Sequence, residues 1–121
     1  MSKRILVVED HEDNRRIMRD LLTSNGYEVI EAVTGVEGVS AAKTYRPNLI
    51  LMDIQLPGIN GYEATRRIKA NLKLQKVPII VVTSYALSGD DIKAFEAGCD
   101  AYISKPFSPR ELLAKVREYL P

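Results

Sequence analysis

The stretch Leu49-Ile50-Leu51-Met52, which Asp53 follows directly, decides the fold class of this chain. All of its positions are apolar, whereas a strand with one face in water alternates apolar and polar residues. A short continuous apolar run is compatible with a strand that is covered by helices on both faces, as in a parallel sheet. The stretch therefore predicts a buried strand of an α/β protein.

Similar short runs and the segments between them extend this prediction to the whole chain. The predicted strands are Arg4–Val8, Tyr27–Ala32, Leu49–Met52, Val77–Val82 and Ala101–Ile103. The predicted helices are His11–Asn25, Gly35–Tyr45, Gly61–Lys73, Ser88–Ala97 and Ser108–Leu120. Consecutive strand and helix units with right-handed crossovers predict a doubly wound parallel sheet of five strands in the order 2-1-3-4-5, the flavodoxin-like arrangement.

The apolar residues of each helix predict which side packs against the sheet. The third helix presents Ala64, Ile68 and Leu72 at successive i+4 positions. The fourth helix offers only Ile92 and Phe95 as large apolar residues, so its hydrophobic anchor is expected to be the thinnest. On the first helix the predicted apolar face consists of Ile17, Met18, Leu21 and Leu22.

Two helix ends carry explicit signals. Gly26 follows the first helix and suits the left-handed backbone that often ends a helix. Ser108, Pro109 and Glu111 form the pattern of a capping box with a first-turn proline. These signals predict where the first helix ends and where the last one begins.

Length and composition indicate one ordinary globular domain over residues 1–121, with 45% hydrophobic and 27% charged residues. The 17 Lys and Arg against 16 Asp and Glu leave a net charge of +1, so no strong field favours direct binding to nucleic acid or to a membrane. The only cysteine, Cys99, cannot close an internal disulfide. The first apolar run is too short for a signal peptide or a membrane span, so we expect a cytoplasmic protein.

Polar side chains follow all but one of the predicted strands where each strand ends. In the predicted order these strands are neighbours and Tyr27–Ala32 is the edge, so their carboxyl ends converge where such folds bind ligands. Taken singly, each polar residue could be a helix cap or a turn residue. The converging segments are Glu9-Asp10, Asp53, Thr83-Ser84 and Ser104-Lys105-Pro106.

The acidic residues of this edge predict a cation site. Glu9, Asp10 and Asp53 would repel one another unless a metal ion or Lys105 neutralised them. Oxygen ligands favour Mg²⁺, with Mn²⁺ as an alternative, over zinc. We expect Asp10 to bind the ion directly, Glu9 through water, and Asp53 and the backbone carbonyl of Gln55 to complete the set.

A carboxylate beside a divalent ion, a lysine and a hydroxyl has the parts needed to accept a phosphoryl group. Asp53, on the central strand, is the expected nucleophile, with Thr83 and Lys105 beside it. Gln55 offers no second carboxylate for acid–base work, which counts against a hydrolase and favours a persistent phosphoaspartate.

The segments ILVVED, LILMDIQLPGINGYE, PIIVVTS and DAYISKPFSPREL, in this order and spacing, make the chain similar to the response-regulator receiver domains of two-component signalling. The resemblance covers essentially the whole length. It implies an acidic pair, a phosphorylated aspartate, a switch hydroxyl, a switch aromatic residue, a phosphate-binding cation and a cis peptide bond. By position these are Glu9 and Asp10, Asp53, Thr83, Tyr102, Lys105, and the bond between Lys105 and Pro106.

Some positions depart from the commonest family pattern. Ser84 stands where a small apolar residue is more usual, and it either adds a hydrogen bond to the phosphoryl group or faces solvent. Gln55 and Tyr85 resemble positions that flank the phosphoryl group, where bulk shields it from water. We therefore expect these residues to modulate the site and self-dephosphorylation to be slow.

The resemblance implies a sensor histidine kinase or a histidine phosphotransfer protein as phosphodonor, docked on the first helix and the loops around Asp53. Arg15, Arg16 and Arg19 are candidate contacts, or simply a solvated charged face. A downstream protein target would bind through the fourth helix, fifth strand and fifth helix.

The chain is therefore expected to be a phosphoacceptor that promotes its own phosphorylation and dephosphorylation, and not an enzyme with a separate substrate. An intact protein of this length would act through protein contacts. Two alternatives remain open: a scaffold that works without phosphorylation, and a receiver domain excised from a hybrid histidine kinase.

Overall fold

The computed structural model describes residues 2–83 and 90–121, and its sheet has the predicted order β2-β1-β3-β4-β5 with every strand pair of the described sheet parallel. The doubly wound α/β fold is thereby confirmed. No helix within those residues is both long and apolar enough to span a bilayer. The strands are β1 (Arg4–Val8), β2 (Glu28–Ala32), β3 (Leu49–Asp53), β4 (Ile79–Thr83) and β5 (Ala101–Ser104). The helices are α1 (Glu12–Ser24), α2 (Gly35–Tyr45), α3 (Gly61–Ala70), α4 (Asp90–Ala97) and α5 (Pro109–Tyr119).

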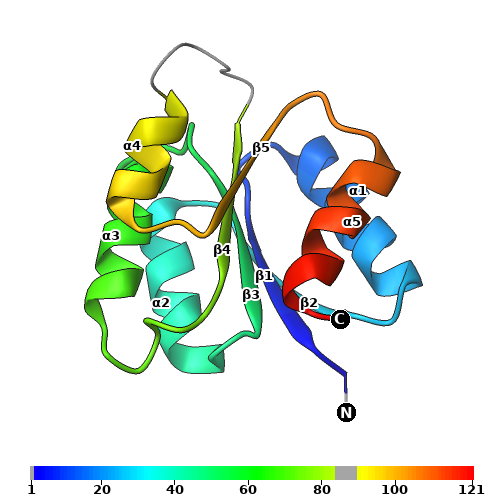
Figure 1. Cartoon of the computed structure of the whole chain (residues 1–121), viewed down its shortest axis with the longest axis horizontal. Coiled ribbons are helices and arrows are strands. Elements are labelled where there is room, and N and C mark those ends of the chain that lie inside the picture. Colours follow the sequence, from blue (N-terminus) through cyan, green and yellow to red (C-terminus); the bar gives the residue numbers. More distant parts are fainter. Residues whose placement is uncertain (1, 84–89) are drawn as a thin grey trace.

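Helices cover both faces of the sheet, with α1 and α5 on one side and α2, α3 and α4 on the other (Figure 1). Successive residues of a strand point to opposite faces, so each strand supplies both layers. In β1, Leu6 and Val8 belong to the core under α2, α3 and α4, whereas Ile5 and Val7 belong to the core under α1 and α5. This two-sided burial is the reason that the strands are apolar at consecutive positions.

The third helix ends three residues earlier than predicted, at Ala70. The side chain of Asn71 accepts a hydrogen bond from the backbone N–H of Lys73 (2.9 Å), which turns the chain out of the helix. Leu72, predicted to face the core, is therefore 82% exposed, and Leu74 is buried in its place.

The helix faces predicted for α4 and α1 are partly wrong. Ile92 and Phe95 are 58% and 52% exposed, and the small side chains of Ala94 and Ala97 lie in the core instead. Ile17 of α1 is 60% exposed. Small residues allow α4 to approach the sheet closely, so its large apolar residues stay on the outer surface.

The predicted helix-end signals are confirmed where the structure describes them. Gly26, which follows the C-cap residue Asn25 of α1, has a left-handed backbone (φ +88°). Ser108 accepts a hydrogen bond from the backbone N–H of Glu111 (3.1 Å), and Glu111 accepts one from the N–H of Ser108 (3.4 Å). The fourth helix was predicted to start at Ser88, which lies outside the described residues. Within the described residues α4 begins at Asp90.

Gly61 brings the first turn of α3 against the end of β3. Its backbone N–H donates to the carbonyl oxygen of Ile54 (2.9 Å), and a Cβ atom at this position would collide with the carbonyl oxygen of Asp53. A glycine is therefore required for the close approach of α3 to the strand that carries Asp53.

Candidate functional site

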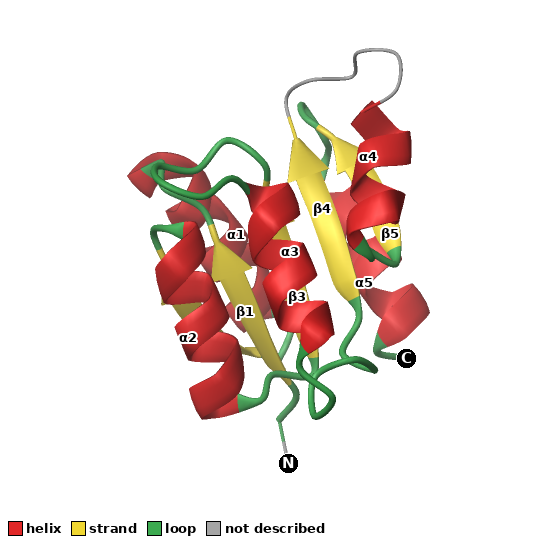
Figure 2. Cartoon of the chain, turned by 90° about the vertical axis from the view of Figure 1, so that its left-hand side faces the viewer, coloured by secondary structure: helices red, strands yellow, loops and turns green. Residues whose placement is uncertain are grey.

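The carboxyl ends of the strands lie at one edge of the sheet, to which the arrowheads of β1 and β4 point in Figure 2. Three strands extend slightly beyond their predicted ends and include Asp53, Thr83 and Ser104 as their last residues. Asp53 pairs in register with Val82, and Thr83 with Ser104. The sheet therefore places the predicted site residues of β3, β4 and β5 on adjacent strands.

Glu9 and Lys105 form the shortest ion pair of this edge among the described residues. The ammonium Nζ of Lys105 lies 2.6 Å from Glu9 Oε1 and 3.7 Å from Asp53 Oδ2. Burial alone would raise the pKa of the fully buried Glu9, but hydrogen bonds with Asp53 and Lys105 and the charge of Lys105 outweigh it, so this pKa is lowered. Glu9 is therefore ionised, and the positive charge of Lys105 lies closer to Glu9 than to Asp53.

Asp53 is only 5% exposed. Burial, followed by the hydrogen bond and the negative charge of Glu9, raises the pKa of Asp53 to about 7 against the opposing charge of Lys105. The repulsion predicted for the acidic cluster thus appears as a raised pKa at Asp53 and not at Glu9. This carboxyl group needs a further positive charge to stay ionised well below neutral pH.

Asp10 and His11 complete the acidic end of β1. The Nδ1 atom of His11 lies 3.4 Å from Asp10 Oδ1 and 3.7 Å from Glu9 Oε2. Within the described residues, no donor makes a hydrogen bond to Asp10 Oδ1, although this atom is buried. A buried carboxylate oxygen with no such donor, next to other carboxylates, fits a divalent cation. The imidazole of His11 adds a nitrogen donor beside Asp10, whereas the sequence prediction assumed oxygen ligands alone.

Thr83 and Tyr102 lie on the same face of the sheet. Thr83 is buried, and alternation along β4 places it on the side of Val81, which belongs to the core under α4. Tyr102 pairs in register with Val81 and packs, half-buried, against that same core. The backbone carbonyl of Thr83 accepts a hydrogen bond from the N–H of Lys105 (2.6 Å), and the predicted cis bond between Lys105 and Pro106 is present.

Of the three residues predicted to modulate the site, the structure describes Gln55. Gln55 is exposed in the loop after β3, and its backbone makes a hydrogen bond with the Asp53 carboxylate. Ser84 and Tyr85 lie outside the described residues.

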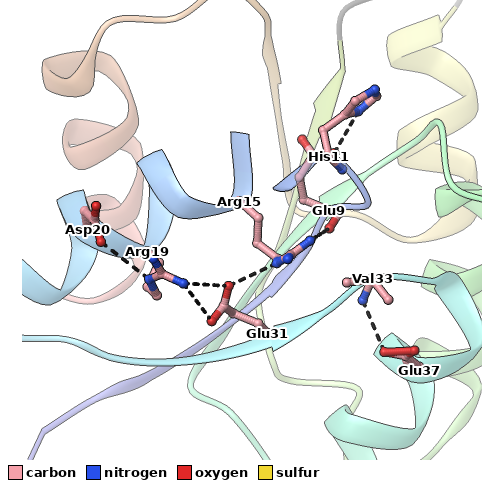
Figure 3. Close-up of polar contacts among 8 residues, drawn as sticks. All are labelled: Glu9, His11, Arg15, Arg19, Asp20, Glu31, Val33 and Glu37. Atoms are coloured by element: carbon pink, nitrogen blue, oxygen red, sulfur yellow. Dashed lines mark hydrogen bonds and ion pairs between the residues drawn. The ribbon is translucent and has the colours of Figure 1, made fainter. Parts of the chain in front are cut away.

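Arg15 and Glu31 also contact the site, although the sequence analysis considered Arg15 only as a docking contact or part of a solvated charged face. Figure 3 shows Arg15 between Glu9 and Glu31. Arg15 Nε donates to Glu31 Oε1 (3.0 Å) and Arg15 Nη1 to the backbone carbonyl of Glu9 (3.1 Å). The sequence held a signal for this contact: the first two strands were predicted to be neighbours, with an acid next to the end of β2 and an arginine early in α1.

Comparisons with known proteins show the family to which the chain belongs. The chain matches the family model of the response regulator receiver domain over residues 5–117. It is 42% identical to the polar-differentiation response regulator DivK of Brucella anthropi over 120 residues, which cover 99% of this chain and 98% of that protein.

Solved structures give the same result. The receiver domain of a sensor histidine kinase from Pseudomonas aeruginosa PAO1, with a magnesium ion coordinated in its active site cleft, is 38% identical with a TM-score of 0.92, covering 99% of this chain and 98% of that one. A CheY-like receiver domain protein from Methanospirillum hungatei JF-1 is 37% identical with a TM-score of 0.91, at 99% and 94% coverage. The family match, the shared strand order and the acidic carboxyl edge show that this chain belongs to the response regulator receiver domains of two-component signalling.

Proposed function

We propose that Asp53 accepts a phosphoryl group from a phosphohistidine donor and that the phosphorylated protein then changes its contacts with other proteins. Residues 1–121 act in this proposal as one receiver domain. The observation that carries it is a buried carboxyl group with a lysine ammonium 3.7 Å away, at the edge where such folds bind ligands. The same lysine holds the neighbouring Glu9 ionised, so the edge is arranged to balance negative charge.

Receiver domains bind Mg²⁺ at an acidic site, and the donor set of this chain fits such an ion. In the proposed site Asp10 binds the metal directly and Glu9 through water, and Asp53 and the backbone carbonyl of Gln55 supply further oxygens. The buried Asp10 Oδ1, which accepts no hydrogen bond from any described residue, supports this assignment. Mg²⁺, or Mn²⁺ in its place, would supply positive charge that offsets the carboxylates and the phosphoryl oxygens.

The chemical step is a transfer to a carboxylate. An oxygen of ionised Asp53 forms a bond to phosphorus, the bond from phosphorus to the donor nitrogen breaks, and its electron pair stays on the imidazole. Lys105 and the Thr83 hydroxyl bind phosphoryl oxygens. In dephosphorylation a water oxygen bonds to phosphorus, the bond from phosphorus to the Asp53 oxygen breaks, and inorganic phosphate leaves. In this proposal the chain therefore promotes both its own phosphorylation and its own dephosphorylation and acts on no separate substrate.

The proposed switch uses the shared face of Thr83 and Tyr102. Phosphoryl oxygens attract the Thr83 hydroxyl, and Tyr102 rotates toward the space that is vacated. Support comes from the register, because Thr83 and Tyr102 lie on adjacent strands with Tyr102 opposite Val81 and Thr83 opposite Ser104. Gln55, Ser84 and Tyr85 are proposed to modulate the lifetime of the phosphoryl group by restricting water.

The proposed donor is a sensor histidine kinase or a histidine phosphotransfer protein. An open, mainly apolar groove of about 490 Å³ runs between α1 and the segment that follows β5. It includes Ile17, Met18 and Phe107, and also Lys105, whose ammonium group lies beside Asp53. A partner seated in this groove would therefore lie next to the phosphoacceptor. Arg15 is an internal contact, whereas Arg16 remains exposed.

The proposed output surface is formed by α4, β5 and α5. Exposed Ile92 and Phe95 of α4 give this surface apolar contacts for a downstream target, and Tyr102 of β5 lies within it.

The free thiol of Cys99 agrees with a cytoplasmic location. The similarity both to DivK and to a kinase-attached receiver is compatible with a stand-alone protein and with a module of a larger one, with the same chemistry.

The experiment that tests the proposal is the intact mass after incubation with Mg²⁺ and a small-molecule phosphodonor. One phosphoryl group should add to the native protein, depend on the metal, and be absent from the Asp53→Ala variant. A folded protein that binds Mg²⁺ but gains no mass from this donor or from a phosphorylated histidine phosphotransfer domain would leave the phosphorylation-independent scaffold as the explanation.

A further inference from the structure

The edge strand β2 contacts the acidic end of β1 through a pair of charged side chains. Glu31, next to the last residue of β2, accepts a hydrogen bond from Arg15 Nε (3.0 Å). The side chains of Arg15 and Glu31 are 17% and 30% exposed, so the pair is partly shielded from solvent. An ion pair of this burial is less screened than one in open solvent.

Arg15 makes a second contact that reaches the site itself. Its Nη1 donates to the backbone carbonyl of Glu9 (3.1 Å), as Figure 3 shows. The N–H of the same residue, Glu9, donates to the carbonyl of Ala32 at the end of β2 (3.0 Å). Both backbone polar groups of Glu9 are therefore tied toward the edge strand, one directly and one through Arg15.

We infer that Arg15, oriented by Glu31, is a positioning residue for the acidic pair Glu9 and Asp10. The inference rests on the proposed metal site and deepens it. The carbonyl of Glu9 belongs to the peptide unit that leads into Asp10, so holding this oxygen restricts rotation of the unit that aims the Asp10 carboxylate. The planar guanidinium can make both hydrogen bonds at once, whereas one lysine ammonium on a flexible stem does not match this fork. The arrangement resembles outer partners of metal ligands, which fix the ligands without touching the metal.

Arg19 provides a matched control within the same cluster. Its Nη1 lies 3.4 Å from each carboxylate oxygen of Glu31, and its Nε pairs with Asp20 at 3.4 Å. No contact of Arg19 with Glu9 is found among the described residues. Removing Arg19 therefore disturbs the pairing of α1 with β2 but leaves the Glu9 carbonyl bonded.

The test compares the Mg²⁺ affinity of native protein, Arg15→Met, Arg19→Met and Glu31→Gln by isothermal titration calorimetry, with circular dichroism to establish folding. Arg15→Met should weaken Mg²⁺ binding by about tenfold or more, the usual loss for an outer partner of a metal ligand. Arg19→Met should stay within about twofold of native, and Glu31→Gln should fall between the two. If Arg15→Met does not fold, Arg15→Lys serves instead, with the same expected direction.

The inference is overturned if folded Arg15→Met, or folded Arg15→Lys in its place, binds Mg²⁺ as native protein does. It is also overturned if Arg19→Met loses as much affinity, or if native protein binds no Mg²⁺. Phosphorylation by a small-molecule phosphodonor is measured separately. A native protein that binds Mg²⁺ but accepts no phosphoryl group contradicts the proposed function, whereas the Mg²⁺ affinities still decide the role of Arg15.

Discussion

At the scale of single residues, neighbours decide the chemistry of the site. Glu9 and Asp53 are both buried, and burial raises the pKa of each, yet their pKa values move in opposite directions. The hydrogen bond between them lowers the pKa of Glu9 and raises that of Asp53, and Lys105 lies closer to Glu9 (2.6 Å) than to Asp53 (3.7 Å). Sequence identifies both as acids but does not show which of them the lysine approaches more closely.

The raised pKa of Asp53 predicts a pH dependence of stability. Its pKa is about 7 in the folded protein against an ordinary 3.8, so the folded state holds the proton more tightly. Between about pH 4 and pH 7 the contribution of Asp53 to stability should therefore fall as pH rises, because ionised Asp53 is penalised only when folded. Asp53→Asn removes this penalty, so its melting temperature in metal-free buffer should exceed that of native protein by a margin that widens from pH 4 to pH 8.

Thermal melts with a chelator, and then with Mg²⁺, check this prediction. Added Mg²⁺ should stabilise native protein more than Asp53→Asn. Asp13→Asn, at an 85% exposed side chain, is the control for removing a carboxylate outside the site. A constant or shrinking margin for Asp53→Asn would show that ionised Asp53 carries no penalty in the folded state.

At the scale of helices and strands, local polar contacts decide where elements begin and end. The Ser108 cap begins α5 where the sequence predicts, whereas the Asn71 side chain ends α3 before the predicted Lys73. Apolar spacing alone did not show that Asn71 would compete with the helix.

The Ser108 cap is expected to contribute measurably to stability. Ser108→Ala removes the oxygen that accepts from the N–H of Glu111, and should cost about 1 kcal/mol of unfolding free energy in urea denaturation. Ser108→Thr keeps a hydroxyl acceptor and should retain most of that free energy. Ser40→Ala, on the exposed side of α2, is the control for losing a serine hydroxyl. Equal unfolding free energies for Ser108→Ala and native protein would mean that the cap adds no stability.

At the scale of the whole molecule, the fold separates the groove beside α1 from the exposed apolar residues of α4. The groove beside α1 and the exposed apolar residues of α4 lie on opposite faces of the sheet, as the placement of these helices in Figure 1 shows. A donor and a downstream target therefore have separate surfaces available.

The groove beside α1 predicts a selective defect in transfer between proteins. Ile17→Glu places a charge in an apolar part of the groove. We expect it to slow phosphorylation by a phosphorylated histidine phosphotransfer domain about tenfold relative to phosphorylation by a small-molecule phosphodonor. Leu72→Glu, at a similarly exposed apolar position after α3, should leave this ratio near that of native protein. Equal ratios for Ile17→Glu and native protein would place the donor elsewhere.

Local sequence patterns were enough to predict the parallel sheet, its strand order and the convergence of Glu9, Asp10, Asp53, Thr83 and Lys105 at one edge. Apolar runs, helix-end signals and the residues that follow each strand are local patterns, and topology then brings the strand ends together. The buried side of α4 and the binding of Arg15 to Glu31 and to the Glu9 carbonyl became known only from the packed structure. Those outcomes depend on how closely elements pack and on which charged partners meet, and neither is encoded in the spacing of one segment.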